Sequence, residues 1–211
     1  SAIKCSSGDA SPSPSARPLL LGVSKARWWI MASFTFMAFM QGVIWSMPGF
    51  ISPTYKRVFG VDDFIIQVFV SYGPFFWFAS CFPAMLHMDR RGAKLCVQLS
   101  AVAVLVSSIL RCVAAHLVPG SVVMMHVAFA VNALAGPVSM GACCRLSEDW
   151  FPLSERVTAT SLMVQGNLCA SLAMYLLVPV VNDEDAPSLQ RLEYIVLALS
   201  ALTAAMCLSY F

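Results

Sequence analysis

Long apolar stretches alternate with short polar connections along this chain. Stretches with almost no charged side chain cover residues 28–51, 64–86, 95–117, 121–144, 157–181 and 192–211. Each is close to or above the ~20 residues that a helix needs to cross ~30 Å of hydrocarbon. A helix satisfies its own backbone hydrogen bonds in lipid, where no water can do so. The pattern therefore predicts an all-α membrane protein with six membrane-spanning helices.

The composition supports a membrane protein and excludes several other classes. Hydrophobic residues make up 59% of the 211 residues and charged residues 11%, against about 25% charged residues in an average soluble domain. The net charge of +2 and the absence of a long basic run argue against nucleic acid as a partner. Seven of the eight cysteines fall in apolar stretches, and the adjacent Cys143 and Cys144 lack the two-residue gap of a metal or redox pair. We therefore predict no metal site and no cofactor.

The basic residues outside the apolar stretches indicate how the chain is oriented. Residues 1–27 and the connections after the second and fourth stretches carry nine Lys and Arg residues, whereas the opposite side carries three. By the positive-inside rule, both termini are predicted to be cytoplasmic. The segment 6–18 is rich in Ser, Pro, Ala and Gly and has too few apolar residues to fold. The predicted organisation is a disordered cytoplasmic tail, 1–27, followed by a six-span transmembrane domain, 28–211.

Two charged residues fall inside the apolar stretches. Arg111 lies near the far end of the third stretch and Glu193 in the first turn of the sixth, and both are expected to reach an interface or a polar interior. No carboxylate is expected deep in a span, so a proton relay of buried acids is not predicted. His116 and His126 flank the connection between the third and fourth stretches and are candidate proton-sensing residues, because imidazole changes charge near physiological pH. The alternative is that both are ordinary surface histidines.

Amides inside the stretches are costly in lipid and normally face other helices or an aqueous cavity. Gln41 and Trp45 are four residues apart in the first stretch and therefore lie on one helix face. Asn132 precedes the Gly136–Pro137 step in the fourth stretch, where the helix is expected to be interrupted. Each amide alone is equally compatible with an ordinary interhelical hydrogen bond, worth ~0.6 to 2 kcal/mol.

The short connection between the second and third stretches has a specific order of residues, Asp-Arg-Arg-Gly-Ala-Lys. Asp89, Arg90, Gly92 and Lys94 match the loop signature of the major facilitator superfamily, which the connection resembles, whereas Met85 stands where that family has its opening Gly. The resemblance implies a gating loop whose charges pair with neighbouring helices and stabilise one closed state. The alternative is a solvated basic loop of the kind that the positive-inside rule explains.

The connection after the fourth stretch carries the most specific motif. Its Trp150-Phe-Pro triplet and its Glu155-Arg156 pair resemble solute carrier family 49, which includes the feline leukaemia virus subgroup C receptor-related and disrupted in renal carcinoma carriers. The resemblance runs from the start of the first stretch to the end of the fifth. From the residues alone, this segment is an interfacial connector in which Trp150 lies at headgroup depth and Glu155 pairs with Arg145 or Arg156.

The resemblance implies a particular fold and a particular set of cavity residues. The fold would be the six-helix N-terminal half of a major facilitator superfamily transporter, built from two inverted repeats of three helices. In such a fold the first and fourth helices line the central path, so Gln41, Trp45 and Asn132 would be substrate-cavity residues. Related carriers of choline-like amines set a first-span Trp against a Gln that directly follows an Asn in the fifth span. Here Asn167 is not followed by Gln, and Gln165 is the candidate substitute.

The function implied is transport of a small organic solute by alternating access, the solute being haem, a choline-like amine or a pyridoxine-like vitamin. The expected setting is the plasma membrane or the lysosomal membrane. The expected partners are the lipid bilayer, the solute, and a missing C-terminal six-helix half or a second copy of the chain. An enzyme is not predicted, because no nucleophile or metal partner accompanies Glu148, Asp149 and Glu155. The alternative function is a non-transporting six-helix membrane scaffold or subunit.

Overall fold

The computed structural model describes residues 25–117, 121–181 and 185–210. Its helices are α1 Ala26–Phe50, α2 Ser52–Phe59, α3 Asp63–Arg91, α4 Lys94–His116, α5 Val122–Leu134, α6 Gly136–Trp150, α7 Arg156–Leu177, the 3-10 helix η2 Val178–Val181, and α8 Ala186–Tyr210. Among these residues, six segments are long and apolar enough to cross a membrane when α5 and α6 are counted as one. The described residues contain no strand, and the predicted all-α fold with six spans is confirmed. Residues 1–24 of the tail predicted at 1–27 lie outside the described residues.

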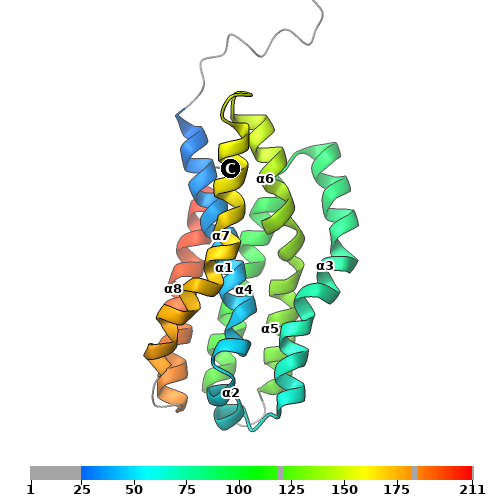
Figure 1. Ribbon diagram of the computed structural model, residues 1–211. Helices are drawn as coiled ribbons and strands as arrows, with labels where there is room; N and C mark the ends of the chain where they lie inside the picture. The colour runs from blue at the N-terminus through cyan, green and yellow to red at the C-terminus, as the bar shows by residue number, and fades with distance from the viewer. Residues whose placement is uncertain (1–24, 118–120, 182–184, 211) are drawn as a thin grey trace, which may run out of the picture.

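The spans form one upright bundle around α1. Figure 1 shows the start of α1 at one end of the bundle and the short helix α2 at the other, with α3 standing at one edge. α1 contacts every other spanning segment, most extensively α7, while α4 packs mainly on α8 and α5. Because α1 is the central helix, the side chains that it carries can reach residues from all the other spans.

Local chemistry sets several helix ends. α1 contains Pro48 in its last turn and is followed directly by α2. α2 is capped by Gly60, whose φ of 66° lies in the left-handed region. Asp62 caps α3 by accepting a hydrogen bond from the backbone N–H of Ile65 at 3.0 Å. Asp185 caps α8 in the same way, and hydrogen bonds from the hydroxyl and N–H of Ser188 lower the pKa of its carboxyl group.

The early start of α8 corrects one prediction from the sequence. α8 begins six residues before the apolar stretch at 192–211, so Glu193 lies two turns inside the helix and not in its first turn. Its side chain is 1% exposed and therefore belongs to the interior of the bundle. A carboxylate does lie deep in a spanning helix, contrary to the expectation from the sequence.

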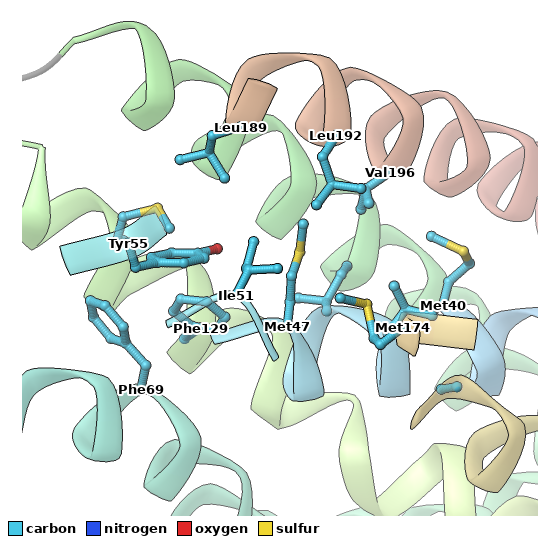
Figure 2. Packing of buried hydrophobic residues seen from close by; sticks show 14 of the residues in the cluster. Met40, Met47, Ile51, Tyr55, Phe69, Phe129, Met174, Leu189, Leu192 and Val196 are labelled. Carbon is cyan, nitrogen blue, oxygen red and sulfur yellow. The ribbon is translucent and has the colours of Figure 1, made fainter. Parts of the chain in front are cut away.

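The apolar interior is divided into two clusters along the length of the bundle. The first core lies toward α2, and Figure 2 shows many of its members: Met40, Met47, Ile51, Tyr55, Phe69, Phe129, Met174, Leu189, Leu192 and Val196. The second core lies toward the start of α1 and includes Ile30, Phe34, Met37, Val97, Leu146, Phe151 and Met163. Along α1 the second core ends at Met37 and the first begins at Met40, so the boundary falls near the middle of the helix.

The fourth span is interrupted at this boundary. α5 ends at Leu134, Ala135 donates its N–H to Asn132 O at 3.1 Å, and α6 starts at Gly136 with Pro137 in its first turn. Proline has no N–H to continue the helical pattern of α5 and fits the first turn of a new helix. The interruption expected at the Gly136–Pro137 step is therefore present, at the depth where the two cores meet.

Candidate functional site

Four polar side chains meet between the two apolar cores, and we call them the amide node: Gln41, Asn132, Ser139 and Asn167. Gln41 Oε1 accepts hydrogen bonds from Asn167 Nδ2 at 2.8 Å and from Ser139 Oγ at 3.2 Å. Asn132 Nδ2 donates to the backbone oxygen of Gln41 at 3.2 Å. The node joins α1, the interrupted fourth span and α7, so residues more than 90 positions apart in the chain form one polar layer.

Some hydrogen-bonding capacity of the node is left over. Gln41 is 6% exposed and Asn132 is 1% exposed. No hydrogen bond from the described residues reaches Asn132 Oδ1, and none involves Gln41 Nε2. Asn132 Oδ1 is buried, and an unpaired buried amide atom costs free energy that a polar group of a bound molecule would relieve. Gln41 Nε2 is likewise available to donate to such a group.

An indole from α3 lies beside the node. A Cβ atom placed on Gly136 would be 3.7 Å from Gln41 Nε2 and 3.6 Å from Cδ1 of Trp77. Gly136 therefore leaves room between the amide and the aromatic ring. Trp77 and Ser139 were not among the predicted cavity residues. Ser139 is a polar residue of the fourth span, and its position seven residues after Asn132, on the same helix face, is the signal that could have placed it there.

Trp45 is fixed between α1 and α3. Its Nε1 donates to the backbone oxygen of Val70 at 3.0 Å. A Cβ atom on Gly73 would collide with the indole ring, so α3 needs glycine at this position. Trp45 thus contacts α3, while Gln41 contacts α6 and α7, although the two residues are one helical turn apart.

The structure places Gln165 away from the amide node. Gln165 is exposed and lines an open apolar groove of ≈ 560 Å³ between α1 and α7, together with Thr35, Phe39 and Gly166. Two residues correspond to about 200° around a helix, so Gln165 and Asn167 project in nearly opposite directions. Of the five predicted cavity residues, the geometry therefore brings together Gln41, Asn132 and Asn167, with Trp45 one turn away.

The predicted gating loop joins α3 to α4 at the end of the bundle opposite α2. Gly92 takes a left-handed φ of 84° and closes α3 by donating its N–H to Met88 O at 2.9 Å. Asp89, Arg90 and Lys94 are exposed, and no ion pair with another described residue is found for Asp89. These charges are therefore accessible at the surface of the chain.

The connector between α6 and α7 has different ion pairs from those expected. Glu155 Oε2 pairs with Arg27 Nη1 at 2.7 Å, not with Arg145 or Arg156. Arg145 pairs within α6 with Asp149 at 3.2 Å, while Arg156 donates to the backbone oxygens of Phe151 and Glu148. The prediction for Glu155 was wrong because Arg27, at the start of α1, is its neighbour only in space.

The same contact fixes the aromatic residues of the connector. The Arg27 guanidinium lies 5.1 Å from the ring centre of Trp28 and 5.5 Å from that of Phe151. The two rings meet edge to face at 5.7 Å. Trp150, at the end of α6, is 37% exposed. The cluster ties the start of α1 to the connector.

The two predicted proton-sensing histidines are each paired with a tyrosine. His116 Nε2 lies 2.7 Å from the hydroxyl of Tyr194, and His126 Nδ1 lies 3.0 Å from the hydroxyl of Tyr72. The His126 ring also packs against Phe69, with ring centres 4.8 Å apart and the ring planes tilted by 60°. The histidines belong to separate pairs, and neither contacts the amide node.

Comparison with known proteins supports the family suggested by the motifs. No protein-family model matches the chain. The chain is similar to the solute carrier family 49 member 4 homologs of Xenopus tropicalis, at 34% identity, and Xenopus laevis, at 33% identity. Each match covers 161 residues, which is 74% of the chain.

The chain belongs to solute carrier family 49. With six segments among the described residues that are long and apolar enough to cross a membrane, it is an integral, multi-pass membrane protein. The matched region makes up 35% of each Xenopus relative, so this family 49 chain spans well under half the length of the curated relatives that it matches.

Proposed function

We propose that this chain is the N-terminal six-helix half of a carrier of the major facilitator type, which moves a small organic solute by alternating access. The observation that carries the proposal is the amide node, a polar layer between two apolar cores at the middle of the spans. Binding sites of such carriers lie near the bilayer midplane where helices are interrupted, and the fourth span is interrupted beside Asn132. Family membership supports solute transport over a scaffold role.

The chemistry of the node narrows the solute to a class. The node contains amide and hydroxyl groups and includes no charged side chain. The indole of Trp77 lies beside it, and the indole of Trp45 lies one helical turn away against α3. Such a site suits a solute with hydrogen-bonding groups and with a flat or cationic part that packs on an aromatic face. Haem, a choline-like amine and a pyridoxine-like vitamin each contain such groups and are the candidates for testing.

Replacing Gln41 by alanine in the full-length protein is expected to reduce solute uptake at least about tenfold, which corresponds to ~1.4 kcal/mol of lost interaction. Alanine lacks Oε1, which accepts the hydrogen bonds from Asn167 and Ser139, and it lacks Nε2, which is available to donate to the solute. Trp45→Ala is expected to act in the same direction. Uptake of radiolabelled choline, pyridoxine and haem, divided by the amount of folded protein in the membrane, measures the effect.

Gln67→Ala is the matched control, because Gln67 is an exposed glutamine on α3. Uptake by this variant is expected to equal that of the parent protein. Unchanged uptake in both Gln41→Ala and Trp45→Ala would contradict the proposed site and favour the six-helix scaffold.

The orientation that we propose places both termini and the α3–α4 loop in the cytoplasm. The excess of Lys and Arg on that side of the chain, nine residues against three, supports this orientation. In it, the exposed Asp89, Arg90 and Lys94 form the gating loop and pair with the other half of the carrier, a second six-helix unit or a second copy. Gly92 provides the turn that presents them.

The two histidine–tyrosine pairs are proposed to make transport sensitive to pH. Protonation adds a positive charge to His116 or His126 beside a tyrosine hydroxyl, near the end of the bundle that contains α2. Replacement of both histidines by glutamine keeps a polar group but removes the titration, so the dependence of uptake on pH between 5 and 8 is expected to flatten. An unaltered pH profile in the double variant would exclude both residues from this role.

A further inference from the structure

The largest fully buried side chain of the described residues is a charged one, Arg111 in α4. Its Nη2 donates to Glu193 Oε1 of α8 at 2.7 Å. Arg111 is 0% exposed and Glu193 is 1% exposed, so both charged side chains are fully buried. An ion pair inside a spanning bundle is costly to form and is a strong indication of a specific role.

The pair also holds the junction between α1 and α2. Tyr55 of α2 is 0% exposed, and its hydroxyl accepts a hydrogen bond from Arg111 Nη2 at 3.1 Å and donates to Glu193 Oε1 at 3.4 Å. Met47 of α1 contacts the same Arg111 nitrogen through its sulfur. One guanidinium therefore touches both sides of the junction at Ile51.

Aromatic rings keep Tyr55 and Arg111 in position. The Tyr55 ring packs against Phe69 and Phe129, with ring centres 6.3 Å and 6.5 Å away, and Arg111 lies 5.2 Å from the centre of the Phe129 ring. Figure 2 shows the Tyr55 hydroxyl directed away from Phe69, toward the interior of the bundle. The Tyr55 ring is thus surrounded by apolar side chains, while its hydroxyl contacts the ion pair.

The junction at Ile51 and Gln41 of the amide node are connected through the same helix, about 15 Å apart along its axis. α1 runs without interruption from Gln41 through Trp45 and Met47 to the junction. Pro48 removes one backbone hydrogen bond there, so the last turn of α1 depends on tertiary contacts for its position. A contact that fixes Met47 and Tyr55 also fixes the rotation of the helix that carries Gln41 and Trp45.

We propose that Tyr55, Arg111 and Glu193 form an elbow lock, which holds the α1–α2 junction against α4 and α8 and thereby positions Gln41 and Trp45 for the solute. These three are positioning residues, because none of them belongs to the amide node. The positioning role rests on the proposed transport function, whereas the lock itself is a property of the fold.

The test uses Tyr55→Phe in the full-length protein, because this change removes one hydroxyl group and leaves the buried ion pair intact. The rate of hydrogen–deuterium exchange of the backbone amides of residues 51–60 is expected to rise about threefold to tenfold. Loss of the net free energy of one hydrogen bond corresponds to a factor of this size. The KM for uptake of tritiated choline or pyridoxine is expected to rise by a similar factor at an unchanged maximal rate. A folding defect would instead lower the maximal rate through fewer active copies.

Tyr175→Phe is the matched control. The Tyr175 ring meets Phe50 edge to face beside the same junction, with ring centres 4.8 Å apart, and phenylalanine retains this ring. No hydrogen bond of the Tyr175 hydroxyl is found among the described residues, and the side chain is exposed. This variant is expected to exchange and to transport like the parent protein.

A double replacement tests the ion pair without leaving a single buried charge. Arg111→Met with Glu193→Leu removes both charges together but leaves the Tyr55 hydroxyl buried without a partner, so exchange at least as fast as in Tyr55→Phe is expected. Adding Tyr55→Phe to the double variant is expected to raise the exchange no further, because the partners of the hydroxyl are already gone.

Unchanged exchange in Tyr55→Phe, or a full additional effect in the triple variant, would overturn the elbow lock. Faster exchange with an unchanged KM would overturn its positioning role. A parent protein that takes up none of the solutes would contradict the proposed function instead, and the exchange measurements would still decide whether the lock exists.

Discussion

Replacing Glu193 by leucine alone is expected to destabilise the folded protein by about 3–5 kcal/mol, because the charge of Arg111 then remains buried without its partner. Arg111 has no route to water, since its side chain is 0% exposed and is enclosed by Met47, Tyr55 and Phe129. The measurement is the thermal unfolding of purified protein in detergent, together with the amount of protein that reaches the membrane. Both are expected to fall sharply.

The double variant Arg111→Met with Glu193→Leu supplies the control for this prediction. Replacement of a whole buried ion pair by apolar residues of similar volume is often neutral or stabilising. The double variant is therefore expected to recover most of the unfolding temperature lost by Glu193→Leu. A double variant as unstable as the single one would show that packing volume, and not the unpaired charge, explains the loss.

Replacing Gly166 by alanine is expected to destabilise the α1–α7 interface by about 1–3 kcal/mol and to abolish most of the solute uptake. A Cβ atom at Gly166 would lie 2.5 Å from the backbone oxygen of Thr35, which cannot move aside without a shift of α1. Separation of the two helices would also pull Asn167 away from Gln41 and Ala38, whose oxygens its amide contacts at 2.8 Å and 3.0 Å. Thermal unfolding and uptake per folded molecule measure the two effects.

Gly49→Ala is the matched control for this change. Gly49 lies in α1, and a Cβ placed there would have no atom of another segment within 4 Å, so alanine meets open space. Normal stability and uptake are expected for this variant. Equal losses at Gly49 and Gly166 would contradict the close packing of α1 on α7 as the cause.

The sequence predicts the spans and much of the amide node for one physical reason. Lipid penalises charges and unpaired amides, so the stretches without charge are recognised as spans, and the few amides within them must face one another. Gln41, Asn132 and Asn167 do meet in the structure. The Gly136–Pro137 step interrupts the helix for an equally local reason, the missing N–H of proline.

Other features depend on contacts that no local pattern contains. The depth of Glu193 follows from the start of α8, which Asp185 sets by capping the helix in an otherwise polar segment. The pairing of Glu155 with Arg27 requires the start of α1 to lie beside the connector. Gln165 was grouped with Asn167 by proximity in sequence, although two residues along a helix point to opposite sides.

The division of the interior into two apolar cores has a mechanical consequence. α1 passes through both cores as one continuous helix, whereas the fourth span is interrupted where the cores meet. A change of angle between α5 and α6 can therefore be taken up at this interruption by rearranging a few polar contacts, with the close apolar packing on either side left undisturbed. The interruption lies at the depth at which Gln41 meets its partners.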